Sequence, residues 1–107
     1  MRRKKRLDSF SLDLIPGSRL TGECHRERWR IERDELDYAC IWGVCDYPGR
    51  TITLNPTMRD KRLLEITVHE VAHAIHQKLS ERDVELIGKA VAKVLWRDGW
   101  RRTQPTE

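Results

Sequence analysis

The hydrophobic pattern of the chain changes its period once, near Thr57. Before this residue, apolar and polar side chains alternate over residues 29–33 and 51–54, which is typical of half-buried strands. Residues 38–44 are expected to add a strand, and residues 10–15 form a short strand or an arm. After Thr57, apolar residues recur at three- and four-residue spacing, which indicates helices. Strands followed by helices predict an α+β domain with a small three-stranded sheet and two helices.

The chain has 107 residues, which is enough for one small domain. Hydrophobic residues make up 38% and charged residues 36%, so the core is thin and a bound metal or a partner would help to stabilise it. We expect a single domain over residues 9–100. A basic disordered tail is expected at residues 1–8 and a polar tail at residues 101–107.

The formal net charge is +4, which permits an anionic partner, and residues 1–8 are the candidate contact with nucleic acid. No apolar run approaches the about 20 residues that a membrane span needs, so we expect no membrane contact. The basic residues 1–6 are followed by an alternating segment and not by the apolar stretch of a signal peptide. These features predict a cytoplasmic protein.

The chain has three cysteines, Cys24, Cys40 and Cys45, and such an odd, small number does not make the disulfide framework of a secreted domain. Together with His25 they offer four ligands for a structural zinc ion, but their spacing matches no common zinc knuckle. The preferred interpretation is that all three are free thiols in a reducing compartment.

The segment His69-Glu70-Val71-Ala72-His73 has a direct chemical interpretation. His69 and His73 are four residues apart on a predicted helix, so they project from one face about 6 Å apart along the axis. Two imidazoles at this spacing can share one Zn²⁺ ion. Glu70 lies about 100° further round the helix, where a carboxylate can act as general base for a zinc-activated water. The segment predicts one zinc ion per chain and Glu70 as the catalytic residue.

A third metal ligand has three candidates. His76 continues the row of histidines, but it is about 10 Å from His69 along a straight helix, too far to share one ion. If the first helix ends near Ile75 and Ser80 caps the second, the two helices form an antiparallel hairpin centred near residue 77 or 78. Acidic residues that begin the second helix then lie level with the two histidines.

In that hairpin, Glu81 is level with His73 and completes a His₂Glu site, while Glu85 is level with His69 and accepts the spare proton of its ring. Gly88 continues the same face and allows the helices to approach closely. If the first helix runs on to Lys78, the register slips and Glu85 becomes the ligand. Glu81 is the favoured ligand of the two.

The motif and the following Leu79-Ser80-Glu81 segment resemble the gluzincin branch of zinc metallopeptidases. The chain is most similar to the small single-domain minigluzincins, many of which come from phages and mobile elements. The resemblance extends over residues 28–100 and includes three upstream segments: Trp29-Arg30-Ile31, Trp42-Gly43-Val44-Cys45-Asp46 and Ile52-Thr53-Leu54. The spacer of seven residues between His73 and Glu81 is shorter than in larger gluzincins.

The resemblance implies hydrolysis of peptide bonds in a protein or peptide substrate. It implies that a strand before the active helix aligns the substrate, and the matching strand is Thr51, Ile52, Thr53 and Leu54. The developing oxyanion also needs a donor, for which the candidates are His76, Tyr38, Tyr47 and Arg50. Two other interpretations stay open: a catalytically silent, zinc-stabilised binding module, and a basic nucleic-acid-binding domain with incidental histidines.

Overall fold

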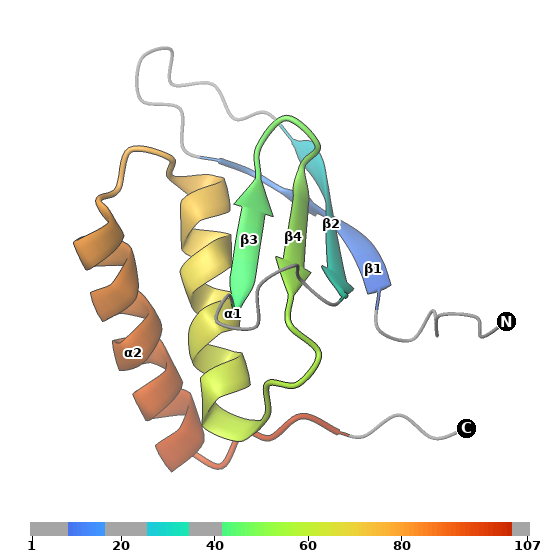
Figure 1. The fold of residues 1–107 in the computed structure, drawn as a ribbon. Coiled ribbons are helices and arrows are strands. Elements are labelled where there is room, and N and C mark those ends of the chain that lie inside the picture. Colours follow the sequence, from blue (N-terminus) through green and yellow to red (C-terminus); the bar gives the residue numbers. More distant parts are fainter. Residues whose placement is uncertain (1–8, 17–25, 35–41, 104–107) are drawn as a thin grey trace, which may run out of the picture.

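A computed structural model describes residues 9–16, 26–34 and 42–103. These residues form four strands and two helices (Figure 1), which confirms the predicted α+β class. In chain order they are β1 (Ser9–Leu14), β2 (Glu27–Arg33), β3 (Gly43–Asp46), β4 (Thr51–Leu54), α1 (Asp60–Ile75) and α2 (Glu81–Arg97). None of the helices in the described ranges is long and apolar enough to cross a membrane.

The sheet differs from the prediction in its number of strands. Residues 9–14 are a full strand, paired antiparallel with β2, so the described sheet has four strands and not three. The strand predicted over residues 38–44 is observed as Gly43–Asp46, and residues 38–41 lie outside the described part of the chain. Asp46 ends this strand, and its Oδ1 accepts a hydrogen bond from the Gly49 N–H at 3.3 Å.

The strand order is β1-β2-β4-β3, so β4 is enclosed and β3 lies at an edge. β2 and β4 run parallel, with Ile31 opposite Ile52, while the other two pairs are antiparallel. A parallel pair needs a connection that crosses over, and the chain returns through β3 before it enters β4 (Figure 1).

Alternation in β2 and β4 places their apolar side chains on one face of the sheet. This face forms the core, with Met58 and Ala74 packed against it, and its strand residues are Trp29, Ile31, Ile52 and Leu54. Each such side chain contributes about 1.5–3 kcal/mol by leaving water. α1 packs on β3 and β4, and α2 packs on α1 (Figure 1), so the helix that carries the histidines lies between the sheet and the outer helix.

Both helix boundaries at the hairpin are as predicted. α1 ends at Ile75 and α2 begins after Ser80, whose Oγ accepts a hydrogen bond from the Asp83 N–H at 3.0 Å. This bond satisfies one of the free N–H groups at the start of a helix. α2 ends at Arg97, and Gly99 follows with a φ of 97°, a conformation that favours glycine.

Candidate metal centre

The register between α1 and α2 is set by close contact at Gly88. A Cβ at this position would lie 2.9 Å from the Glu65 carbonyl oxygen and 3.5 Å from the His69 Cβ. On the rim of the same contact, Lys89 Nζ lies 3.2 Å from the Glu65 carboxylate. The predicted close approach at Gly88 is therefore confirmed, and the first turn of α2 lies level with the last turns of α1.

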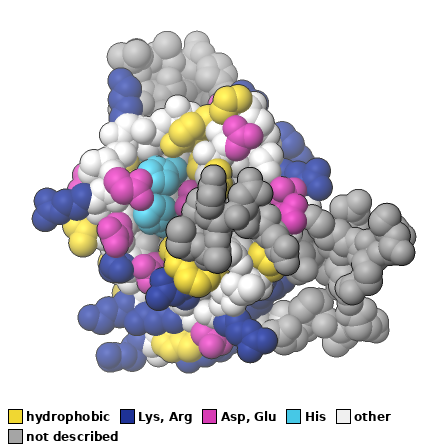
Figure 2. All heavy atoms as spheres, viewed as in Figure 1, with side chains coloured by type: hydrophobic (Ala, Val, Ile, Leu, Met, Phe, Trp, Pro, Cys, Tyr) yellow, Lys and Arg dark blue, Asp and Glu magenta, His cyan; other side chains and the backbone are white. Residues whose placement is uncertain are grey.

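This register brings three side chains with metal-binding atoms together. The Nε2 atom of His69 lies 2.9 Å from Glu81 Oε2, and the Nε2 atom of His73 lies 3.0 Å from Glu81 Oε1. Metal-binding atoms of the three residues all lie within 4.8 Å of one another, and they form the one such group among the described residues. The histidine side chains gather in a single surface patch with acidic side chains beside it (Figure 2), so solvent and ions can reach them.

The donor set fits a zinc ion. Two imidazole nitrogens and one carboxylate oxygen are ligands that zinc accepts, and a fourth position remains for water or substrate. Ligands about 2.0–2.1 Å from a tetrahedral ion are about 3.3 Å apart. The two histidines contact different Glu81 oxygens, at 2.9 and 3.0 Å, so these contacts would open slightly around an ion, and the wider separations in the group, all within 4.8 Å, would close. The two rings are edge-to-face with centroids 5.0 Å apart, which leaves both Nε2 atoms directed at Glu81.

Glu81, and not Glu85, lies at the histidine pair. Glu85 is exposed and lies beside, not on, the buried face through which α2 contacts α1. Its carboxylate lies 3.6 Å from Lys89 Nζ and makes no hydrogen bond or ion pair with a described histidine. The expectation that Glu85 accepts the spare ring proton of His69 is therefore wrong.

His76 follows α1 and is not part of the cluster. Its backbone N–H donates to the Ala72 carbonyl at 3.0 Å, which closes the last turn of the helix. Its Nδ1 atom is buried and has no hydrogen-bond partner within the described ranges. Of the three histidines on and after α1, only His69 and His73 therefore belong to the metal group, and His76 does not.

Glu70 lies on the side of α1 that faces the sheet. It is only 7% exposed, and a Cβ at Gly43 of β3 would lie 3.0 Å from its Oε2. Burial raises the pKa of the Glu70 carboxyl above its usual value, although the neighbouring His69 and His73 oppose the shift. Among the described residues, no group donates a hydrogen bond to this carboxylate.

The substrate strand predicted from the sequence is wrong. Thr51–Leu54 forms β4, which pairs with β2 on one side and β3 on the other, so its backbone groups are used within the sheet. An added strand needs an edge with free N–H and C=O groups. On the side of the sheet next to α1, that edge belongs to β3, Gly43–Asp46.

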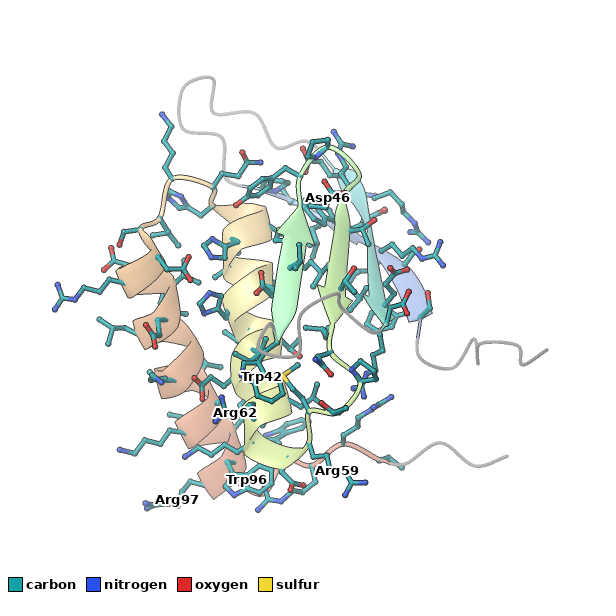
Figure 3. All side chains as sticks on the ribbon, viewed as in Figure 1. Trp42, Asp46, Arg59, Arg62, Trp96 and Arg97 are labelled. Carbon is teal, nitrogen blue, oxygen red and sulfur yellow. The ribbon has the colours of Figure 1, made fainter. Side chains whose placement is uncertain are left out.

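The outward groups of β3 follow from its register. The Asn55 N–H donates to the Trp42 carbonyl at 2.8 Å, which marks this pair as hydrogen bonded, and Val44 opposite Thr53 is the next bonded pair. Because bonded and non-bonded pairs alternate, the N–H and C=O groups of Gly43 and Cys45 are directed toward the outer edge. Arg62 of α1 lies 5.2 Å from the Trp42 ring centre (Figure 3) and ties the start of β3 to α1.

The four candidate oxyanion donors are not equivalent. Tyr38 lies outside the described residues, and Arg50 pairs with Glu27 of β2 at 3.5 Å. Burial raises the pKa of the Tyr47 phenol, and the nearby carboxylates of Glu70 and Glu81 raise it further. Tyr47 is therefore a neutral phenol at physiological pH, close enough to both carboxylates to sense their charge.

The structure gives little support for a functional role of the cysteines or of the basic residues 1–8. Cys24, His25, Cys40 and residues 1–8 lie outside the described residues. Burial and the adjacent Glu70 and Asp46 raise the pKa of Cys45 to about 12, so its sulfur is a protonated thiol. A protonated thiol is a poor metal ligand and a poor nucleophile.

Sequence reasoning missed the part of Gly43 in the site. This residue lets β3 approach Glu70 closely, because any side chain there would meet the carboxylate or Ile66. A glycine inside a strand pattern is a known sign of close approach, and that signal is present directly after Trp42.

Comparisons with protein-family models, with curated proteins and with solved structures find no match to this chain. Any function must therefore be argued from the geometry of His69, Glu70, His73 and Glu81 and from the strand beside them.

Proposed function

We propose that this protein is a zinc-dependent peptidase that hydrolyses peptide bonds in a protein or peptide substrate, with Glu70 as general base. One observation carries the proposal. The metal-binding atoms of His69, His73 and Glu81 lie within 4.8 Å of one another. The buried carboxylate of Glu70, which is not among them, lies beside this group on the helix that carries the two histidines. A site that served folding alone would not need that fourth residue.

His69, His73 and Glu81 would hold the metal in this proposal. A bound zinc ion would polarise a substrate carbonyl and lower the pKa of a water toward about 7. The short sequence of the hairpin explains how so small a domain can build the group. Only five residues separate α1 from α2, and Ser80 fixes where α2 begins.

Glu70 would move the proton. Its carboxylate takes a proton from the attacking water and later delivers it to the leaving nitrogen. Burial against Gly43 raises the pKa of this carboxyl, and a base whose pKa is nearer to the working pH also returns the proton more readily. Such a group is worth about 10²–10⁴-fold in rate.

The outer edge of β3 would align the substrate. An extended peptide that pairs with the outward groups of Gly43 and Cys45 runs alongside the Glu70 carboxylate, because Gly43 is in contact with that side chain. Tyr47 follows the same strand, and its neutral phenol is the favoured donor to the developing oxyanion.

The test is hydrolysis of a peptide library derived from a whole proteome, with new peptide termini detected by mass spectrometry. The zinc-loaded protein is expected to cleave, and Glu70→Gln is expected to keep its zinc and lose about 10²–10⁴-fold in rate. Glu85→Gln is the matched control, since it removes a carboxylate four residues from Glu81 that lies away from the histidines.

Two results would contradict the proposal. Cleavage that survives Glu70→Gln would remove Glu70 from the chemistry. Zinc bound by His69, His73 and Glu81 with no cleavage anywhere in the library would favour the silent, zinc-stabilised module.

A further inference from the structure

The outer face of α2 is apolar and uncovered. Leu86 is 53% exposed, Val94 is 66% exposed and Ile87 is 38% exposed, and Ala90 between them is also exposed. Among the described elements, α2 packs mainly on α1, and it does so through its opposite face at Val84, Gly88 and Ala92. A helix that packs through one face does not need this second stripe.

The stripe is symmetric about Ala90. At about 100° per residue, Leu86 and Val94 lie about 40° to either side of Ala90 and one turn before and after it. A two-fold axis through Ala90 would bring an antiparallel second copy of α2 onto this face and place Leu86 of each copy against Val94 of the other. The small side chain of Ala90 at the centre allows the two helices to approach closely.

The charged residues at the two ends of the stripe are related by the same two-fold axis. Asp83 and Arg97 lie seven residues before and after Ala90 and about 20° to either side of it. Neither the Asp83 carboxylate nor the Arg97 guanidinium forms an ion pair with another described residue, and Figure 3 shows Arg97 extending from the end of α2. The axis that pairs Leu86 with Val94 therefore also pairs Asp83 of one copy with Arg97 of the other, twice per dimer.

We propose that α2 is a self-association surface and that the protein forms an antiparallel homodimer through Leu86, Ala90 and Val94, flanked by ion pairs between Asp83 and Arg97. A second copy is the occupant this face fits, because the axis that places Leu86 against Val94 also places Asp83 against Arg97. One helix from each copy buries less than the about 1,600 Å² of a standard interface, so we expect a weak dimer that dissociates on dilution.

The dimer leaves the metal group accessible. Glu81 precedes Ala90 by nine residues, which puts the two on opposite sides of the helix. Glu81 faces His69 and His73 of its own chain, while Ala90 faces the second copy. The inference is therefore independent of the peptidase proposal.

The test exchanges the charges one at a time and then mixes the products. Sedimentation equilibrium of the full chain, from about 1 µM to about 1 mM, is expected to show a concentration-dependent change from one chain to two. Asp83→Arg and Arg97→Asp each replace both attractive pairs by repulsive ones, so each is expected to raise the dimer dissociation constant at least about tenfold.

An equimolar mixture of the two single variants restores both attractive pairs. The Asp83→Arg chain carries arginine at both ends of the stripe and the Arg97→Asp chain carries aspartate at both. Every ion pair across the mixed interface then joins opposite charges, so the mixture is expected to dimerise as the wild type does. Lys61→Glu, an exposed change on α1, is the control and should leave the dissociation constant unchanged. Circular dichroism of each single variant checks that α2 is intact.

A wild type that is monomeric at every concentration would overturn the proposal. So would a dimer that neither single variant weakens, or one that both weaken and the mixture fails to restore. Leu86→Lys tests the apolar part of the interface and leaves the charged residues at the helix ends unchanged. It is expected to abolish the dimer, and a dimer that survives it uses another surface.

Discussion

Gly88 of α2 lies directly against the backbone of Glu65 in α1, so that a Cβ at residue 88 would stand 2.9 Å from the Glu65 carbonyl oxygen. Glu81 is two turns before Gly88 on its helix, and His69 is about one turn after Glu65 on the other. The close approach and the grouping of His69, His73 and Glu81 are therefore two consequences of one register. Gly88 positions the metal ligands without touching a metal.

Replacing Gly88 by valine should separate the helices and weaken zinc binding. The new side chain has no space beside the Glu65 carbonyl, and overpacking of this kind costs about 1–3 kcal/mol. We expect a lower melting temperature and at least about a tenfold loss of zinc affinity, measured by competition with a chromophoric chelator. Arg82→Val puts the same side chain on the exposed face of α2 and should change neither value. Wild-type affinity in Gly88→Val would show that the register does not depend on this contact.

Glu81 and Glu85 should differ sharply in their effect on zinc content. Glu81→Ala removes one of the three ligands, so we expect a loss of about 100-fold or more in affinity and little zinc in the purified protein. Glu85→Ala removes a carboxylate that contacts Lys89, so it should retain close to one zinc per chain. Elemental analysis of both variants, purified without added zinc, measures their zinc content per chain. Zinc retained by Glu81→Ala and lost from Glu85→Ala would reverse the ligand assignment.

The grouping of His69, His73 and Glu81 could be predicted from the sequence because each step rests on a local signal. The histidines share a helical face by their spacing, and Ser80 marks the start of the next helix. A spacer of fixed length then determines which residues lie level. The Glu85 prediction failed because Glu85 lies beside, and not on, the buried face of α2, where it contacts Lys89.

The order of the strands could not be predicted in the same way. Residues 51–54 alternate apolar and polar side chains, and this pattern is the same for an enclosed strand and for an edge strand. The parallel pairing of β2 with β4 joins segments about 20 residues apart and leaves no local sign in the sequence. The identity of β3 as the edge beside Glu70 therefore required the structure.

The charge on Glu70 should destabilise the protein when no metal is bound. Burial raises the pKa of this carboxyl, so the folded state holds its proton more tightly than the unfolded state does. The contribution of Glu70 to the free energy of unfolding is therefore highest below the ordinary carboxyl pKa, and it falls as the pH rises from that value through the raised pKa of the folded state. Glu70→Gln removes the free-energy cost of ionising this buried carboxyl.

The expected result is a higher melting temperature for Glu70→Gln than for the wild type in chelator at neutral pH. The difference should shrink toward zero as the pH falls below about 4, where the wild-type carboxyl becomes protonated in both states. Glu85→Gln removes an exposed carboxylate and should show no such pH-dependent gain. A Glu70→Gln protein that is less stable than the wild type at neutral pH would mean that the ionised carboxylate is stabilised by its neighbours.

The backbone of β3 should exchange its amide protons in an alternating pattern. The N–H groups of Val44 and Asp46 are directed at β4, whereas those of Gly43 and Cys45 are directed at the outer edge. Hydrogen exchange followed by NMR is expected to show slow exchange at the first two positions and fast exchange at the other two. Adding a peptide from the cleavage library to the zinc-loaded Glu70→Gln protein should slow exchange at Gly43 and Cys45, because the peptide becomes their hydrogen-bond partner. Protection that appears elsewhere, with Gly43 and Cys45 unchanged, would show that β3 does not align the substrate.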